Sequence, residues 1–222
     1  LKLVGNIQDE IQMSLNGLAG GCCFAFNNHC NQLFLVGTEE GKIHKCSKAY
    51  TGQYLQTYEG SNCMAIYALK WSPFHPRAFL SCSADWTVKL WDHTQSLPIM
   101  SFDMGTQVGD ICWSTYASTV FAVATAQGKV HVFDLAQNKH RAICDQKVTK
   151  KSKLTHLSFN SKDPILLVGD DRGVVESFKL SPNLRKDYFE SEILSTAEER
   201  NAAQVELMEK IIQGIEITKI GS

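Results

Sequence analysis

The sequence has little charge imbalance, few prolines and no long hydrophobic run. Its 22 basic and 23 acidic side chains give a net charge of −1, so no global electrostatic attraction to nucleic acid or to an acidic membrane is expected. No apolar stretch approaches the roughly 18 residues of a membrane span, and no signal-peptide pattern opens the chain. Apolar residues make up 44% of the chain and charged residues 20%, a composition typical of a globular domain.

Cysteine is too sparse and too irregularly spaced for a disulfide scaffold. The chain has eight cysteines, none in a C-x-x-C pair, and several lie in apolar, strand-like runs. Reduced, buried thiols are therefore expected. His29-Cys30 and His44-x-Cys46 lack the further ligands of a structural zinc site, so no metal site is predicted. Since the chain begins at Leu1 rather than at Met, we interpret it as a piece of a longer protein.

Motifs for catalysis and nucleotide binding are also missing. Residues 37–42 (GTEEGK) have one residue too few between the glycines for a phosphate-binding loop, and Ile43 stands where that loop needs a hydroxyl. No nucleophile elbow, zinc-binding histidine pair or kinase motif occurs. Asp170 and Asp171 fall in a predicted β-turn, where acidic side chains cap the backbone. No catalytic residue and no cofactor is predicted, and function is expected to come from the surface.

The sequence does contain a repeat of about 44 residues. Each of four units has an apolar run, a polar turn and an alternating run. The turn positions are Gly41, Trp86, Gly128 and Gly173, which are 45, 42 and 45 residues apart. A second alternating run upstream in each unit closes on an aromatic residue: Phe26, Trp71, Trp113 and Phe159. A period near 44 with several short strands per unit predicts the blades of a β-propeller.

The second unit closely resembles a WD repeat. Residues 83–92 (SADWTVKLWD) end in the Trp-Asp dipeptide of that family, and the next unit has a conservative version. The Gly-His pair that often opens such repeats is missing from all four units, so the family's buried Asp–His–Ser–Trp network would be incomplete. The predicted fold class is all-β, a WD-repeat β-propeller of about four blades plus a C-terminal α-helix. The predicted structural residues of the repeat are Asp85, Trp91, Asp92, Trp71, Trp113, Phe133 and Asp134.

A wider resemblance covers residues 20–186. Three segments, 36–47 (VGTEEGKIHKCS), 81–94 (SCSADWTVKLWDHT) and 168–173 (VGDDRG) followed by SPNLRK, are similar to the C-terminal half of dynein intermediate chains. The axonemal outer-arm type is the most similar. The resemblance implies a seven-bladed ring whose first blades precede this sequence. Residues 1–21 would be the end of a preceding blade and a connector, 22–181 four blades, and 182–222 a tail.

The same resemblance implies a non-catalytic scaffold in an axonemal outer-arm dynein. The propeller would bind the tail of a dynein heavy chain and support arm assembly for ciliary motility. Another intermediate chain is a second implied partner, whereas light chains would bind only upstream regions. The implied location is the cytoplasm and cytoskeleton, in the axoneme of a cilium or flagellum. The alternatives are a peptide-binding WD adaptor, such as a ubiquitin-ligase substrate receptor, and a cytoplasmic dynein intermediate chain.

The C-terminal tail predicts an amphipathic helix at about 196–213. Ser195 with Glu198 fits a capping box, and Gly214 fits a helix stop. A lone helix of this length is marginal in water, so its apolar stripe must be covered by the chain's own propeller or by a partner. The stripe residues, which are partner-binding candidates, are Val205, Met208, Ile212 and Ile215.

Two loops supply the other partner-binding candidates. Trp86 stands in a turn where most repeats carry a small or charged residue, and Arg172 lies in the corresponding turn of the fourth unit. Tryptophan and arginine are enriched at interface hot spots, although packing on the neighbouring blade is the alternative for Trp86. The basic connector 147–153 (KVTKKSK) would suit an acidic partner or form a solvated loop. Its candidates are Lys150, Lys151 and Lys153.

Overall fold

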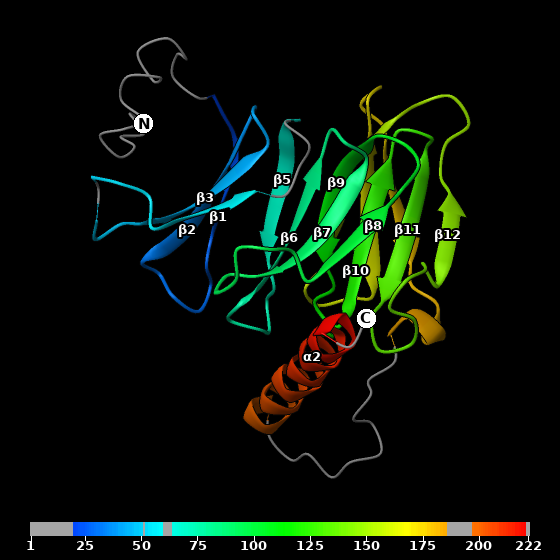
Figure 1. Cartoon of the computed structure of the whole chain (residues 1–222). Coiled ribbons are helices and arrows are strands. Elements are labelled where there is room, and N and C mark those ends of the chain that lie inside the picture. The colour runs from blue at the N-terminus through cyan, green and yellow to red at the C-terminus, as the bar shows by residue number, and fades with distance from the viewer. Residues whose placement is uncertain (1–19, 51, 60–63, 186–196, 221–222) are drawn as a thin grey trace.

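The computed structural model describes residues 20–50, 52–59, 64–185 and 197–220, which are mostly β-structure. The strands form four antiparallel sheets, each built from strands that follow one another in the chain. These sheets are the predicted blades, and Figure 1 shows them side by side from blue to yellow, with the α-helix at one end of the blades. The predicted all-β propeller with a C-terminal helix is thereby confirmed.

Three of the blades have four strands, and the fourth has three among the described residues. Blade 1 contains β1 (Gly21–Phe26), β2 (Leu33–Thr38), β3 (Lys42–Ser47) and β4 (Gln56–Glu59). Blade 2 contains β5 (Ile66–Trp71), β6 (Ala78–Ser83), β7 (Thr87–Asp92) and β8 (Met100–Asp103). Blade 3 contains β9 (Val108–Trp113), β10 (Val120–Thr125), β11 (Lys129–Asp134) and β12 (Cys144–Lys147). Blade 4 contains β13 (Leu154–Phe159), β14 (Ile165–Asp170) and β15 (Val175–Lys179). A short 3-10 helix, η1 (Pro182–Arg185), follows β15, and α2 (Ala197–Ile220) is the C-terminal helix.

The first strand begins one residue earlier than expected. Gly21, placed in a connector from the sequence, is the first residue of β1 and pairs with Thr38 of β2. Residues 1–19, expected to end a preceding blade, lie outside the described residues.

The tight turn between the second and third strands has the same backbone conformation in all four blades. Its residues Gly41, Trp86, Gly128 and Gly173 have φ values of 83°, 68°, 72° and 82°. This left-handed region favours glycine, because a side chain there meets the backbone. The four turn positions that the sequence period aligned are therefore structurally equivalent, and Trp86 is the exception in residue type.

Buried clusters join neighbouring blades. In blade 2, Phe79 and Trp91 are register partners on β6 and β7 and belong to a cluster that also contains Leu35 and Ile43 of blade 1. Phe121 and Phe133 are the corresponding pair in blade 3 and pack with apolar residues of blade 2. Both pairs stack, with ring centroids 5.8 and 4.9 Å apart. Each of these two blades thus turns its aromatic pair toward the blade that precedes it.

Tryptophans at the ends of β5 and β9, the first strands of blades 2 and 3, add a second link between blades. The indole nitrogen of Trp71 donates to the carbonyl of Ala25 on β1, at 3.1 Å. Trp113 repeats the contact one blade later, donating to the carbonyl of Lys70 on β5, at 3.0 Å. In the sequence repeat, an aromatic residue closes the first strand of each blade. Where that residue is tryptophan, its indole nitrogen thus donates a hydrogen bond to the preceding blade.

Both ends of the described arc present apolar sheet faces to solvent. Phe24 and Phe26 of β1 are 69% and 48% exposed, and Phe26 pairs in register with Phe34 of β2. This is the face on which blades 2 and 3 meet a preceding blade. At the other end, Leu167 and Val175 of blade 4 are 40% and 69% exposed, opposite the face buried against blade 3.

Helix α2 extends from Ala197 to Ile220, beyond the predicted end at residue 213. Gly214 does not stop it, which corrects the sequence prediction. Ile215, one residue later, is buried against the propeller, and burying this side chain outweighs the roughly 1 kcal/mol that a glycine costs inside a helix. The predicted cap Ser195 lies outside the described residues. Within the described part of the chain, neither helix combines the length and the apolar character that a membrane span requires.

Candidate partner-binding surfaces

The apolar stripe of α2 packs on the chain's own propeller. Met208 is fully buried, and Ile212 and Ile215 are nearly so, in the cluster that joins blades 2 and 3. Val205 is half-buried at the edge of the stripe. Of the two surfaces left open by the sequence, the chain's own propeller is therefore the one that covers these residues, so the buried members of the stripe are not available to a partner. The physical reason is the apolar surface that blades 2 and 3 offer at this end.

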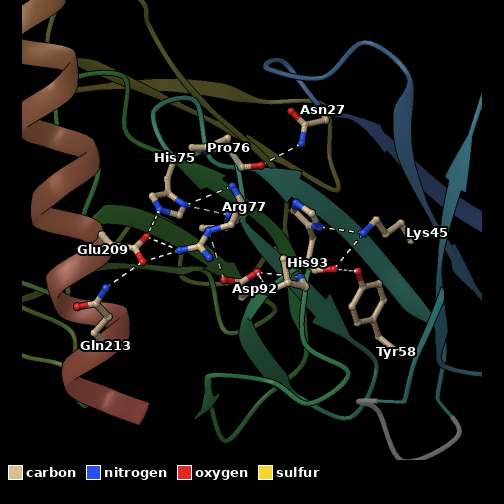
Figure 2. Close-up of polar contacts among 12 residues, drawn as sticks. Asn27, Lys45, Tyr58, His75, Pro76, Arg77, Asp92, His93, Glu209 and Gln213 are labelled. Carbon is tan, nitrogen blue, oxygen red and sulfur yellow. Dashed lines mark hydrogen bonds and ion pairs between the residues drawn. The ribbon is translucent and has the colours of Figure 1, made fainter. Parts of the chain in front are cut away.

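A polar cluster fixes the register of α2 on blade 2 (Figure 2). The carboxylate of Glu209 accepts hydrogen bonds from Arg77 Nη2, at 2.5 Å, and lies 2.9 Å from His75 Nε2. Arg77 Nε is also 3.7 Å from the carboxylate of Asp92, the acidic residue of the WD dipeptide. A second anchor lies on blade 3, where Ser118 donates from its backbone nitrogen and its hydroxyl to Gln204. We call Glu209 with His75 and Arg77 the helix clasp.

The electrostatics of the helix clasp follow from its hydrogen bonds. His75 is buried, and its Nδ1 accepts from the backbone nitrogens of Arg77 and Ala78. The ring proton is therefore on Nε2, which donates to Glu209. The hydrogen bond from Arg77, helped by His75, lowers the pKa of Glu209 from 4.5 to about 2, although partial burial acts in the opposite direction.

We expect acid to weaken the helix clasp. The Glu209 carboxyl takes up a proton near its ordinary pKa in the unfolded chain but only near pH 2 in the folded one. Its stabilising contribution is therefore complete above about pH 4.5 and is lost as the pH falls toward about 2. The measurement is the urea midpoint at about pH 6 and about pH 3, for the natural sequence and for Glu209→Gln. A pH dependence that is the same in both would contradict the assignment.

Removing the charge of Glu209 at neutral pH is expected to loosen α2. Glu209→Gln leaves Arg77 without this carboxylate in a partly buried place, which should cost about 1–2 kcal/mol of unfolding free energy. Glu206→Gln is the matched control, because Glu206 pairs with the exposed Lys210 in solvent, at 2.8 Å, and its loss should change stability little. Amide hydrogen exchange in α2 would measure the difference. Equal protection of the α2 amides in both variants would contradict the prediction.

A second set of polar contacts joins blades 1 and 2 (Figure 2). The hydroxyl of Tyr58 donates to the backbone carbonyl of His93, at 2.6 Å, and Lys45 Nζ lies 2.9 Å from His93 Nδ1. Burial lowers the pKa of Lys45 and of His93 and raises the pKa of Tyr58. In each case burial disfavours the charged form, and the partners lie within the chain. These groups therefore form a structural seam between the two blades.

The other candidates lie at the opposite end of the blades from α2, which we call the loop end. It carries the tight turns between second and third strands and the connectors that lead into each new blade. Trp86 is 51% exposed there, so it does not pack fully on the neighbouring blade. Lys150, Lys151, Lys153 and Arg172 are all exposed on the loops around blade 4. The structure thus brings Trp86 and the basic candidates to the same end of the propeller.

A pocket of about 430 Å³ lies between these loops. Tyr67 of blade 2, Gln107 and Gly109 of blade 3, and Lys153 and His156 of blade 4 all line it. His156 is exposed and its Nδ1 lies 3.7 Å from the carboxylate of Asp110. The lining thus comes from three consecutive blades, at the same end as Trp86 and the basic candidates.

Histidines and aspartates outside the pocket have structural partners. His44 contacts the hydroxyl of Thr57 and His131 the carboxylate of Asp145. Asp170 accepts from the backbone nitrogens of its own turn, as predicted, and Asp85 accepts from the backbone nitrogen of Thr87. Burial raises the pKa of the Cys82 and Cys112 thiols. Among the described residues, no group of three His, Cys, Asp or Glu side chains is arranged to hold a metal ion.

The helix clasp was not predicted from the sequence. Arg77 and Glu209 are 132 positions apart, and neither belongs to a motif. One indication was available: Glu209 adjoins Met208 on the buried side of the predicted stripe, where an acidic residue requires a partner.

Comparison with known proteins identifies relatives of this chain. Residues 52–92 match the family model "WD domain, G-beta repeat". The chain is 60% identical over 175 residues to "Dynein intermediate chain 2, ciliary" of Heliocidaris crassispina, covering 78% of this chain and 25% of that protein. It is 51% identical to "Dynein, 78 kDa intermediate chain, flagellar outer arm" of Chlamydomonas reinhardtii, covering 82% and 27%. The chain therefore spans about a quarter of the length of these relatives.

A solved structure supports the fold alone. Chaetomium thermophilum Raptor superimposes with a TM-score of 0.65 at 16% identity, over 73% of this chain and 16% of that one. The resemblance stated from the sequence is confirmed by the comparisons, and the fold is confirmed independently by the structure.

Proposed function

We propose that this chain, which belongs with the WD-repeat intermediate chains of axonemal dyneins, is part of a non-catalytic scaffold subunit of an outer-arm dynein motor complex. Its location would be the cytoskeleton of a cilium or flagellum, in the axoneme. The observation that carries the proposal is the identity of 60% and 51% to ciliary and flagellar intermediate chains over 78% and 82% of this chain. ATP hydrolysis and force generation would belong to the heavy chain.

The propeller would bind the tail of a dynein heavy chain and support assembly of the arm. Two features of the blades support this role. Their repeated residues are buried between neighbouring blades, and their loop end exposes polar and charged side chains around a pocket. Another intermediate chain is the second proposed partner. Light chains would bind regions upstream of these blades, and neither nucleic acid nor membrane is a proposed ligand.

The two exposed sheet faces support a larger ring. Phe24 and Phe26 at one end, and Leu167 and Val175 at the other, form apolar patches of the kind that a partner surface usually covers. We infer that further blades of the same protein cover them in a ring of seven, since the matched relatives are about four times as long as the region matched here. Unpaired sheet edges in isolation would invite aggregation.

Purification of the tagged, full-length protein from cilia tests the proposal. A dynein heavy chain should co-purify in stoichiometric amounts, and cross-links should run from these blades to the heavy-chain tail. Recovery of a ubiquitin ligase without heavy chain would favour the peptide-binding adaptor instead. Recovery of the cytoplasmic dynein heavy chain would favour the cytoplasmic intermediate chain.

A further inference from the structure

The left-handed turn of blade 2 contains a residue that its backbone does not favour. Trp86 has a φ of 68°, whereas the three equivalent turns use glycine. A residue with a Cβ destabilises the fold when its backbone adopts this left-handed conformation, and among such residues only asparagine and aspartate adopt it readily. Trp86 is also 51% exposed, so about half of its surface gains nothing from burial within the chain. The backbone of this turn thus disfavours tryptophan, and a residue that is strained and half-exposed fits the pattern of residues kept for binding.

Other apolar side chains are exposed beside this turn. The hydroxyl of Ser83, three residues before Trp86, donates to the backbone carbonyl of Met64, at 3.2 Å, which holds the connector against the turn. Met64 is 48% exposed, and Tyr67 on the adjoining strand is 41% exposed. Tyr67 also borders the pocket of about 430 Å³. Trp86, Met64 and Tyr67 are therefore exposed apolar side chains at the loop end of blade 2, and Tyr67 extends this set to the pocket.

The far side of the pocket is basic. Lys153 lines it directly, and Arg172 Nη2 donates to the backbone carbonyl of Lys151, at 3.3 Å, which places the guanidinium beside the connector. Among the described residues, none of the ammonium groups of Lys150, Lys151 and Lys153 forms an ion pair.

Three aspartates of the turns and connectors of blades 2 to 4 accept hydrogen bonds from within the chain, and Asp171 itself lines the pocket. Asp171 accepts from the backbone of Lys153, at 3.2 Å, and Asp170 accepts from its own turn and from Ser152. Asp103, near the Trp86 turn, accepts from the backbone of Gly105. These carboxylates keep their charge, but on the loops around blade 4 the four basic side chains Lys150, Lys151, Lys153 and Arg172 outnumber Asp170 and Asp171, so the net charge there is positive.

We propose that the loop end of blades 2 to 4 binds an extended, acidic segment of a protein partner, with an apolar side chain of that segment on Trp86. Acidic side chains of the segment would meet Lys151, Lys153 and Arg172 across the pocket. A tryptophan anchor next to complementary charge is the usual composition of an interface hot spot. This inference rests on the proposed function only for the source of the partner, a subunit of the same dynein arm.

Two variants of the full-length protein test the anchor and the charges separately. Trp86→Gly should leave the melting temperature unchanged or raised, because glycine suits the turn, and should weaken partner binding at least about tenfold. Leu97→Gly is the matched control, since Leu97 is 69% exposed on a loop at the other end of blade 2. Lys151→Glu with Lys153→Glu should also weaken binding, whereas Lys162→Glu, exposed at the opposite end of blade 4, should not.

The partner is identified in purified native arms with a zero-length carbodiimide, which joins lysines to carboxylates. Cross-links from Lys150, Lys151 or Lys153 to a dynein subunit are the expected result. In intact cilia, cross-links from these lysines to acidic residues of a protein outside the arm would support the surface and overturn the proposed function. A lowered melting temperature for Trp86→Gly, unchanged binding in both loop-end variants, or arms without such cross-links would overturn the surface itself.

Discussion

Replacing Trp91 by alanine should destabilise the propeller by about 3–5 kcal/mol, which is a large part of the stability of a typical domain. The side chain is completely buried at the seam of blades 1 and 2. Its ring lies against Phe79, nearly parallel, and meets the edge of Tyr58. Its indole nitrogen donates to the hydroxyl of Ser81, at 2.9 Å. Deletion therefore leaves a cavity and takes this donor away from a buried hydroxyl.

The Trp91→Phe variant separates these two contributions. Phenylalanine occupies the corresponding position in blade 3, where Phe133 stacks on Phe121, so most of the packing should survive. The loss should then fall to about 1–2 kcal/mol, from the Ser81 hydroxyl and the smaller ring. Denaturant unfolding of the full-length protein measures both. Equal, small losses for alanine and phenylalanine would mean that blades 1 and 2 are not held together at this position.

The repeat made most of the fold predictable, because its information is local. Turn residues at a fixed period, and alternation with period two, depend on neighbours a few positions away. The equivalence of Gly41 and Trp86 followed from that spacing alone. The bond between Trp91 and Ser81 is the surviving part of the network expected to be incomplete, and it too lies within one repeat.

Features that depend on distant segments were not predictable in the same way. Gly214 carries the local mark of a helix end, yet the buried Ile215 takes the helix past it. The clasp between Arg77 and Glu209 joins segments that share no pattern in the sequence. The candidate site could therefore be predicted only in part. Trp86 and the lysines were recognisable as unusual from the sequence, but their position at the same end as one pocket depends on how the blades are arranged.

That arrangement depends on a close approach of inner strands β9 and β13. A Cβ atom on Gly109 would lie 2.1 Å from the backbone carbonyl oxygen of Leu154, a distance at which one of the strands must move. The neighbouring Asp110 accepts from the backbone nitrogen of Leu157, at 3.0 Å, across the same contact. Gly109→Ala should therefore separate blades 3 and 4 and cost about 3 kcal/mol, at the upper end for overpacking.

A series of glycine-to-alanine variants can divide this cost into backbone and contact parts. Gly52 lies outside the left-handed region and has no atom within 4 Å of where a Cβ would stand, so its variant should change stability by about 0.5 kcal/mol or less. Gly173 has the left-handed φ in open space, so it should show only the conformational cost, about 1 kcal/mol. Gly109 shows the contact cost, and Gly128, with a φ of 72° and the carbonyl oxygen of Thr149 at 2.5 Å, shows both. Urea unfolding should rank them in that order; a Gly109 variant as stable as the Gly52 variant would mean that the blades tolerate a wider spacing and that the pocket is not fixed by this contact.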